Sequence, residues 1–318
     1  MFRRPLTFVL LALAAVSGLQ ASEIAPGVDL LPGRFVRGEQ PDGNTVLLRG
    51  ETGLIVVDTG RHTEHTQAIV DYAKQAKLPI AAIVNTHWHL DHISGNAMLR
   101  RVFPGVRIYA SDALAAAQRG FLATYRAQLA DAVAKTSDAA QRASWEAEMA
   151  RIDAGAQLAP DEVVTASGER RIAGRALDLR LTDHAVTAAD LWLRDEKSRV
   201  VVAGDLVTLP VPLFDTACPA HWQEALGQLA NADFDVLVPG HGALMDRKRF
   251  ATYRKAFDHL LSCAASKQEK GACIDGWMQD ASGLLTGEDP AWVRSMLDYY
   301  LDKSLRGDAA HRAELCGN

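Results

Sequence analysis

Three histidines and one aspartate fall within a six-residue segment that directly follows an apolar run. The run, Ile80 to Asn85, is typical of a strand buried between layers, and His87, His89, Asp91 and His92 come just after it. Side chains two residues apart on an extended segment point to the same side, so His87 and His89 can bind one ion together. Asp91 and His92 can face a neighbouring ion. Because imidazole and carboxylate groups are ligands of zinc and related divalent metals, the segment predicts a metal site at a strand end.

Three further candidate ligands each follow a later apolar strand. They are His184 after 177–181, Asp205 after 200–204, and His241 after 236–240. Loops at one end of a layered α/β fold converge in space, and binding residues are often found on them. With the first cluster, these residues complete two metal sites.

The rest of the chain has the pattern of a layered α/β protein. Strand-like runs form two groups, and between them apolar residues recur at three- to four-residue steps over about 111–156. We interpret that stretch as a helical insertion, and we expect it to cover the mouth of the site as a lid. The predicted organisation is a main domain at 22–250, which contains the insertion, and a helical C-terminal extension at 251–318.

The first 21 residues have the layout of a secretory signal peptide. Arg3 and Arg4 precede an apolar run at 8–16, and a small residue, Ala21, ends the segment. The run is too short to span a bilayer, and no other stretch approaches that length. We therefore predict a periplasmic or secreted protein that is not an integral membrane protein.

The cysteines indicate disulfides, and the net charge limits the kinds of partner that the protein can bind. The four cysteines are Cys218, Cys263, Cys273 and Cys316, an even number that suits two disulfides and allows three pairings. If the two neighbouring cysteines pair, Cys218 and Cys316 are left to clamp the C-terminal tail. The net charge of -5 offers no basic excess for a phosphate backbone, which argues against nucleic acid and favours a small-molecule substrate.

Four segments together resemble the metallo-β-lactamase-fold hydrolase superfamily. They are Val56–Gly60, His87–His92, Gly204–Asp205 and Pro239–Gly242, and the resemblance covers roughly 24–250. It implies an αββα sandwich with the site at one edge of the two sheets.

The resemblance also implies a ligand set for two metal ions, most simply zinc, with manganese or iron as alternatives. His87, His89 and His184 would bind the first ion, Asp91, His92 and His241 the second, and Asp205 would bridge them. One departure concerns the loop around His184, which lacks the glycine before and the Thr-Pro-Gly after the histidine that the family usually has.

A dinuclear site of this kind predicts a hydrolase in which a metal-bridging hydroxide attacks an ester, lactone, thioester or amide-type substrate. Asp91 would orient the nucleophile or carry a proton. Aspartate at position 205 resembles the general hydrolases of the family, whereas its lactam-cleaving members have Cys or Ser there. The alternatives are a β-lactamase, a mononuclear iron dioxygenase that oxidises sulfur compounds, and a non-catalytic metal-binding protein.

Overall fold

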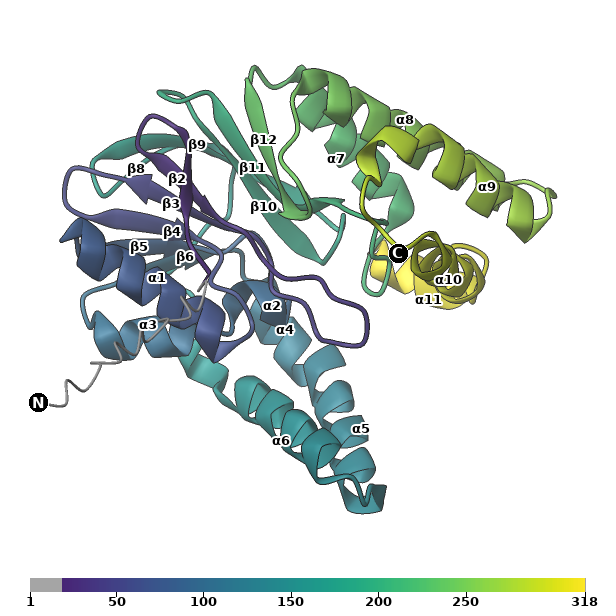
Figure 1. Ribbon diagram of the computed structural model, residues 1–318, viewed down its shortest axis with the longest axis horizontal. Coiled ribbons are helices and arrows are strands. Elements are labelled where there is room, and N and C mark those ends of the chain that lie inside the picture. The colour runs from purple at the N-terminus through teal and green to yellow at the C-terminus, as the bar shows by residue number, and fades with distance from the viewer. Residues whose placement is uncertain (1–18, 318) are drawn as a thin grey trace, which may run out of the picture.

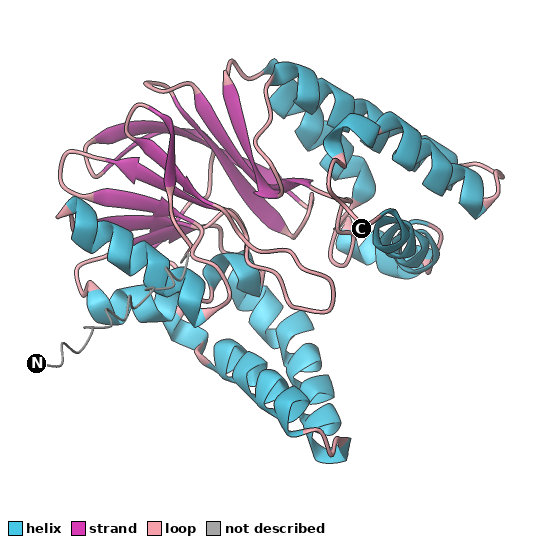
Figure 2. Cartoon of the chain, viewed as in Figure 1, coloured by secondary structure: helices cyan, strands magenta, loops and turns pink. Residues whose placement is uncertain are grey.

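Two β-sheets face each other and helices cover their outer faces, as Figures 1 and 2 show for this computed structural model, which describes residues 19–317. Most of the predicted signal peptide, at 1–18, lies outside the described residues. The first sheet has the strand order β1 (Ser22–Ala25), β2 (Val28–Leu31), β3 (Thr45–Arg49), β4 (Leu54–Val57), β5 (Ile80–Val84), β6 (Arg107–Ala110) and β7 (Glu162–Val163). The second has the order β12 (Val236–His241), β11 (Val200–Thr208), β10 (Ala189–Asp195), β9 (Arg175–Asp183) and β8 (Gly168–Ile172).

Strand direction changes within each sheet. The strands from β1 to β4 pair antiparallel, and those from β4 to β7 pair parallel. In the second sheet β8 to β11 are antiparallel, and β12 lies parallel to β11. Parallel neighbours end at the same edge of a sheet, so β5 in one sheet and the β11–β12 pair in the other can bring their following loops together.

The helices are distributed over both outer faces and two extensions. Their bounds are α1 (Thr63–Ala76), α2 (Leu90–Ile93), α3 (Asn96–Val102), α4 (Ala113–Arg119), α5 (Phe121–Lys135), α6 (Ala139–Asp153), α7 (Pro219–Asn231), α8 (Arg247–Ala265), α9 (Lys270–Asp280), α10 (Pro290–Tyr300) and α11 (Ala309–Leu315), with the short turns η1 (Gly155–Gln157), η2 (Ser282–Leu284) and η3 (Leu301–Leu305). Helices α5 and α6 form a hairpin that projects away from the sheets (Figure 1). None of the helices in 19–317 has the length and apolar character needed to cross a membrane.

The alternation of side chains along β3 and β4 explains the layers. Val46, Leu48, Ile55 and Val57 face the second sheet and pack with residues such as Leu191 and Val202. The residues between them point the other way and pack against α1 and α3: Leu47, Leu54, Val56. Both faces are apolar because both are covered, which is the reason why the strand sequences read as continuous hydrophobic runs.

The αββα sandwich confirms the predicted fold class. The expected helical stretch consists of three helices, α4 to α6, and the region of the expected C-terminal extension contains most of α8 and the helices α9 to α11. The C-terminal helices share one core with the outer face of the second sheet, in which Trp222, Phe257 and Trp277 are fully buried. The sequence did not predict strands β1, β2, β7 and β8 or helices α2, α9 and α11, because their segments are short or weakly periodic.

The two disulfides form one of the three pairings that the sequence allows. Cys263 pairs with Cys273, and Cys218 pairs with Cys316 across a sequence separation of 98 residues. The second bond ties the end of α11 to the segment that leads into α7.

Candidate metal centre

Three strand ends meet at one edge of the sandwich and carry the candidate ligands. His87 and His89 lie in the loop after β5, and Asp91 and His92 lie in the short helix α2 that follows. Asp205 lies in β11, and His241 is the last residue of β12. Gly240 makes this approach feasible, since a Cβ there would lie 1.9 Å from Asp205 Oδ1.

Five ligand atoms in this cluster are buried and have no hydrogen-bond partner within residues 19–317. They are His87 Nε2, His92 Nε2, His241 Nε2 and both carboxylate oxygens of Asp205. Buried polar atoms are normally paired, and an orphaned group calls for an explanation such as an ion. Two overlapping groups can each surround a cation: His87, His92 and Asp205, and Asp91, His92 and His241. The donor set therefore fits a divalent metal.

Neighbouring side chains orient two of the imidazoles. Asp58 Oδ2 lies 2.8 Å from His92 Nδ1, and Asp58 also accepts hydrogen bonds from the backbone and hydroxyl of Thr86. The Thr86 hydroxyl in turn lies 2.9 Å from His87 Nδ1. Because both Nδ1 atoms are engaged, both Nε2 atoms face the cluster. Contacts of this kind fix the tautomer and the orientation of histidines that bind metals.

The charges in the cluster favour a bound cation. Burial opposes a charge on His92, but Asp205, Asp58 and Asp91 together raise the pKa of this histidine well above its usual range. Burial raises the pKa of Asp205 as well, yet His92, His241 and His87 outweigh it and hold that pKa well below its usual range. The buried carboxylates thus attract positive charge, which a metal ion would supply.

His89 and His184 are placed differently from the other expected ligands. The His89 ring lies 4.5 Å from the His87 ring, but its Nε2 is 2.8 Å from the hydroxyl of Thr216. His184 follows β9 in the left-handed region, with a φ of 51°, and its Nδ1 lies 3.0 Å from the carbonyl of Leu315 at the end of α11. Neither histidine belongs to the two groups within 19–317 whose ligand atoms could surround a cation. The Cys218–Cys316 disulfide joins the C-terminal turn, which contacts His184, to the segment before α7.

A buried ion network connects the insertion to the cluster. Arg61 forms a short ion pair with Glu148 of α6, and its Nη2 lies 3.4 Å from Asp91 Oδ1. Arg151 donates to Glu148 at 3.1 Å and to the Arg61 carbonyl at 2.8 Å. Asp91 is therefore held from one side by Arg61 and from the other by His241, whose Nε2 is 3.0 Å from Asp91 Oδ2.

Replacing Glu148 with alanine should destabilise the protein strongly. The side chains of Arg61 and Glu148 are 9% and 4% exposed, so the variant leaves a buried guanidinium with Asp91 as its remaining acidic partner. Breaking such a pair costs about 3 kcal/mol or more. Urea unfolding would measure the loss, with Glu146→Ala on the exposed face of α6 as the matched control. Equal stability of the two variants would contradict the proposed role of the network.

A cavity of about 410 Å³ opens beside the cluster and is lined in part by the insertion. Asp91, Asp205 and His89 form one part of its wall, and the apolar part includes Phe35, Trp88, Phe121, Tyr125, Leu213, Trp292 and Met296. Phe121 and Tyr125 belong to α5, which supports the expectation that the insertion covers the site. Trp88 and Leu213 line this cavity, whereas His62 is not part of its lining and lies in hydrogen-bond contact with Asp42.

Asp215 and Tyr300 also line this cavity, and the sequence did not identify them as functional residues. Tyr300 donates a hydrogen bond of 2.6 Å to Asp215 Oδ2, and burial raises the pKa of Asp215. Asp215 follows the apolar run 209–214 directly, a position that could have drawn attention to it. Tyr300 lies at the end of α10, where no sequence pattern marks it.

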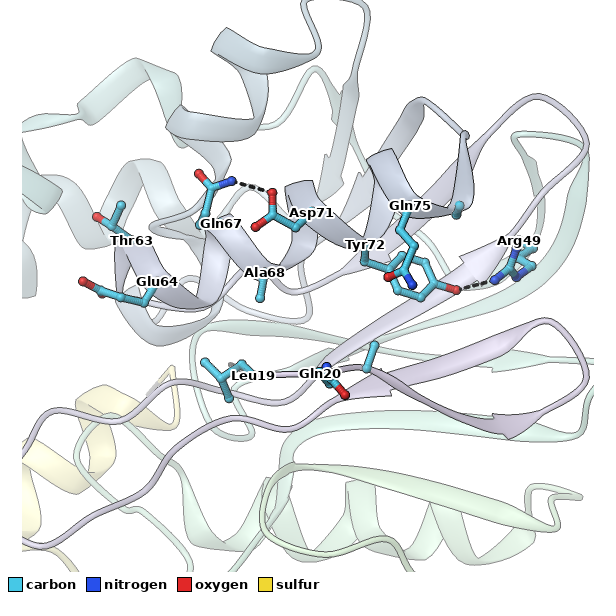
Figure 3. Close-up of a pocket in the computed structure, with 12 residues that line it drawn as sticks. Leu19, Gln20, Arg49, Thr63, Glu64, Gln67, Ala68, Asp71, Tyr72 and Gln75 are labelled. Atoms are coloured by element: carbon cyan, nitrogen blue, oxygen red, sulfur yellow. Dashed lines mark hydrogen bonds between the residues drawn. The ribbon is translucent and has the colours of Figure 1, made fainter. Parts of the chain in front are cut away.

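A second, larger cavity of about 910 Å³ lies along α1. Its lining residues come from the N-terminal part of the chain, before the candidate ligands in the sequence. Figure 3 shows its lining, in which Gln67 donates to Asp71 and Arg49 donates to the Tyr72 hydroxyl. It contains none of the candidate ligands. The smaller cavity is therefore the candidate substrate site.

A family model described as the metallo-beta-lactamase superfamily matches residues 39–241. The match covers more than half of the chain, so the chain belongs to the metallo-beta-lactamase superfamily, and the resemblance of its motifs is confirmed.

Two relatives with a known function are similar to parts of the chain. The linear primary-alkylsulfatase of a Pseudomonas species is 29% identical over 216 residues, which cover 62% of this chain and 40% of the relative. The atrochrysone carboxyl ACP thioesterase of Aspergillus fumigatus is 35% identical over 101 residues, covering 28% of this chain and 32% of the relative. The chain spans less than half the length of these relatives. Their names describe hydrolases, which supports the prediction that this protein is an enzyme.

Solved structures agree on the fold. A metallo-beta-lactamase from Pontibacter korlensis superposes with a TM-score of 0.56 at 19% identity, over 76% of this chain and 99% of that one. A sec-alkylsulfatase from a Pseudomonas species superposes with a TM-score of 0.58 at 18% identity, over 90% of this chain and 51% of that one. At these identities the likeness concerns the fold alone.

Proposed function

We propose that this protein is an exported, zinc-dependent hydrolase that cleaves an ester, lactone, thioester or related bond in a small molecule with an apolar part. The observation that carries the proposal is the aromatic cavity whose wall includes Asp91, Asp205 and His89. Concave sites with apolar walls and a few convergent polar groups are typical of small-molecule binding. The names of the two relatives, an alkylsulfatase and a thioesterase, support an ester-type bond.

Asp91, His92 and His241 would hold a cation, and His87 and Asp205 beside His92 could hold a neighbouring one. Their nitrogen and oxygen donors suit zinc. When bound, a zinc ion lowers the pKa of water and polarises the bond that is to be broken. Burial raises the pKa of Asp91, but His92, His241 and Arg61 outweigh it and hold that pKa below its usual range. Asp91 therefore stays ionised and orients the nucleophile, while Arg61 positions Asp91.

Asp215 is the cavity residue best suited to supply a proton to the leaving group. Its pKa is raised because it is buried, so a larger share of it is protonated than for an ordinary carboxyl group. The hydroxyl of Tyr300, 2.6 Å away, holds its carboxyl in place at the cavity wall.

Export is supported by the cysteines. Disulfides form and persist in oxidising compartments, and all four cysteines are paired. The charged and apolar segments of the first 21 residues remain the direct argument for a cleaved signal peptide.

A substrate panel tests the function. The purified mature protein is assayed with a p-nitrophenyl ester, a lactone, a thioester, an alkyl sulfate and a cephalosporin, before and after chelation and after zinc is restored. We expect turnover of at least one ester-type substrate that is lost on chelation and recovered with zinc. Turnover of the cephalosporin alone would favour the β-lactamase alternative. Absence of turnover together with bound iron and oxygen uptake would favour the dioxygenase.

A further inference from the structure

A row of apolar side chains leads from His241 along one part of the wall of the 410 Å³ cavity. The ring centre of His241 lies 5.1 Å from that of Phe35, and the ring of Phe35 lies 5.3 Å from that of Trp292. Met296 follows Trp292 by four residues on α10, so the two side chains lie on the same face of that helix, and both line the cavity. We call Phe35, Trp292 and Met296 the Phe35 row. Its outer part comes from the C-terminal extension.

A second row leads from His89 along another part of the wall. The ring of Trp88 lies 4.7 Å from that of His89 and 5.5 Å from that of Phe121. Phe121 in turn lies 6.3 Å from Tyr125, one turn further along α5. We call Trp88, Phe121 and Tyr125 the Trp88 row. Its outer part comes from the insertion, and Phe121 is 47% exposed, which is typical of an aromatic side chain at a binding surface.

The positive charges near the two rows are already paired. Arg61 is the only lysine or arginine in the lining of this cavity within 19–317, and its guanidinium contacts Glu148 and Asp91. Arg37 lies outside the lining, in the loop that carries Phe35, and pairs with Asp289 at 3.4 Å. An anionic group held between the rows would lose water without gaining a cationic partner.

The acidic side chains in the outer part of the lining are engaged as well. Glu39 contacts Arg34 at 3.0 Å, and Asp215 accepts the hydrogen bond of Tyr300. An ammonium group between the rows would therefore compete with an existing partner for a carboxylate. The two rows are suited to a group that carries no charge.

We propose that the Phe35 row and the Trp88 row bind an uncharged aliphatic or aromatic chain of the substrate, and that Trp292 and Phe121 select substrates by this chain. The bond to be cleaved would lie at the end of the cavity that Asp91 and Asp205 form. The inference rests on the proposed hydrolase function and adds the chemical nature of the chain. Binding energy from a chain remote from the reacting bond can raise kcat/KM, by about fourfold for each buried methylene group.

A series of p-nitrophenyl esters tests the chain. The acetate, butyrate and hexanoate esters are assayed in zinc-supplemented buffer below their critical micelle concentrations. We expect kcat/KM to rise about fourfold per added methylene. The monoester of adipate and the ester of 6-trimethylammoniohexanoate carry a charge at the far end of the chain. Each should react with a kcat/KM about tenfold or more below that of the hexanoate ester, because the rows offer no free counter-charge.

Two variants test the residues. Trp292→Ala and Phe121→Ala should each lower the ratio of kcat/KM for hexanoate to that for acetate by about tenfold. The ratio is the readout, because a general defect of the fold lowers the turnover of both esters alike. Arg294→Ala is the matched control, since Arg294 is a long, exposed side chain on α10 that does not line the cavity, and it should keep the ratio. Circular dichroism checks that each variant is folded.

Calorimetry separates this inference from the proposed function. Binding of 1-octanol needs no turnover, and we expect it to be weaker in Trp292→Ala and absent for 8-hydroxyoctanoate. If no ester is cleaved, the hydrolase proposal fails, and the binding of 1-octanol alone decides on the rows. Turnover without a chain preference, a preference for a charged chain, or a ratio that both variants leave unchanged would overturn the inference and leave a hydrolase intact.

Discussion

Replacing Asp205 with alanine should abolish hydrolysis while leaving the fold in place. The side chain is 2% exposed, and both of its oxygens face the metal cluster without a hydrogen-bond partner in 19–317. The variant removes a donor of the zinc ion and one of the carboxylates that keep the cluster attractive to a cation. A loss of about 4 kcal/mol of transition-state stabilisation corresponds to a decrease in kcat/KM of about a thousandfold.

The measurement is kcat/KM on the best ester-type substrate, together with zinc content and thermal stability. Asp183→Ala is the matched control, because Asp183 is an exposed aspartate at the end of β9. We expect the control to keep both activity and zinc. An Asp205→Ala protein with activity within tenfold of the wild type would contradict the assignment of the site.

The second large effect concerns stability. Removing the Cys218–Cys316 disulfide by a double substitution to alanine should cost more than removing Cys263–Cys273 in the same way. The first bond closes a loop with a sequence separation of 98 residues, and the second closes one of 10. The loss of chain entropy predicts about 4.7 kcal/mol for the long loop and about 2.7 kcal/mol for the short one.

Urea unfolding of the two oxidised double variants would measure the difference. The long-loop variant should also release α11, because within 19–317 the hydrogen bond that remains between this helix and the end of β9 is the single one of 3.0 Å between His184 and the Leu315 carbonyl. Faster proteolysis at the C-terminus would report this release. A smaller loss of stability for the long-loop variant than for the short-loop variant would contradict the entropic explanation.

The hydrophobic pattern of the sequence was sufficient to predict most of the strands of the sandwich. The strands 54–57 and 80–84 are apolar on both faces, and that pattern predicts burial between two layers in any context. Helix α8 has a regular apolar face and an Asp246 N-cap, which are signals that a sequence shows directly. Short edge strands such as β1 carry no comparable signal, because four residues that pair on one side look like a loop in the sequence.

The sequence predicted ligands of the candidate site from their position directly after apolar strands. His87, Asp91, His92, Asp205 and His241 meet because the strands before them end at one edge of the sandwich. The place of His184 could not be predicted in this way. It depends on the contact with α11, which a disulfide over 98 residues holds in position.

Local periodicity and side-chain chemistry were enough to predict the class of the fold, the motif after β5, the kind of metal ligand and the residues at three strand ends. The tertiary structure decided which ligands meet, how Arg61 links Asp91 to Glu148, and which aromatic side chains form the cavity. These features join segments as far apart in the sequence as Phe35 and Met296, and such contacts arise from packing, which leaves no periodic trace in the chain.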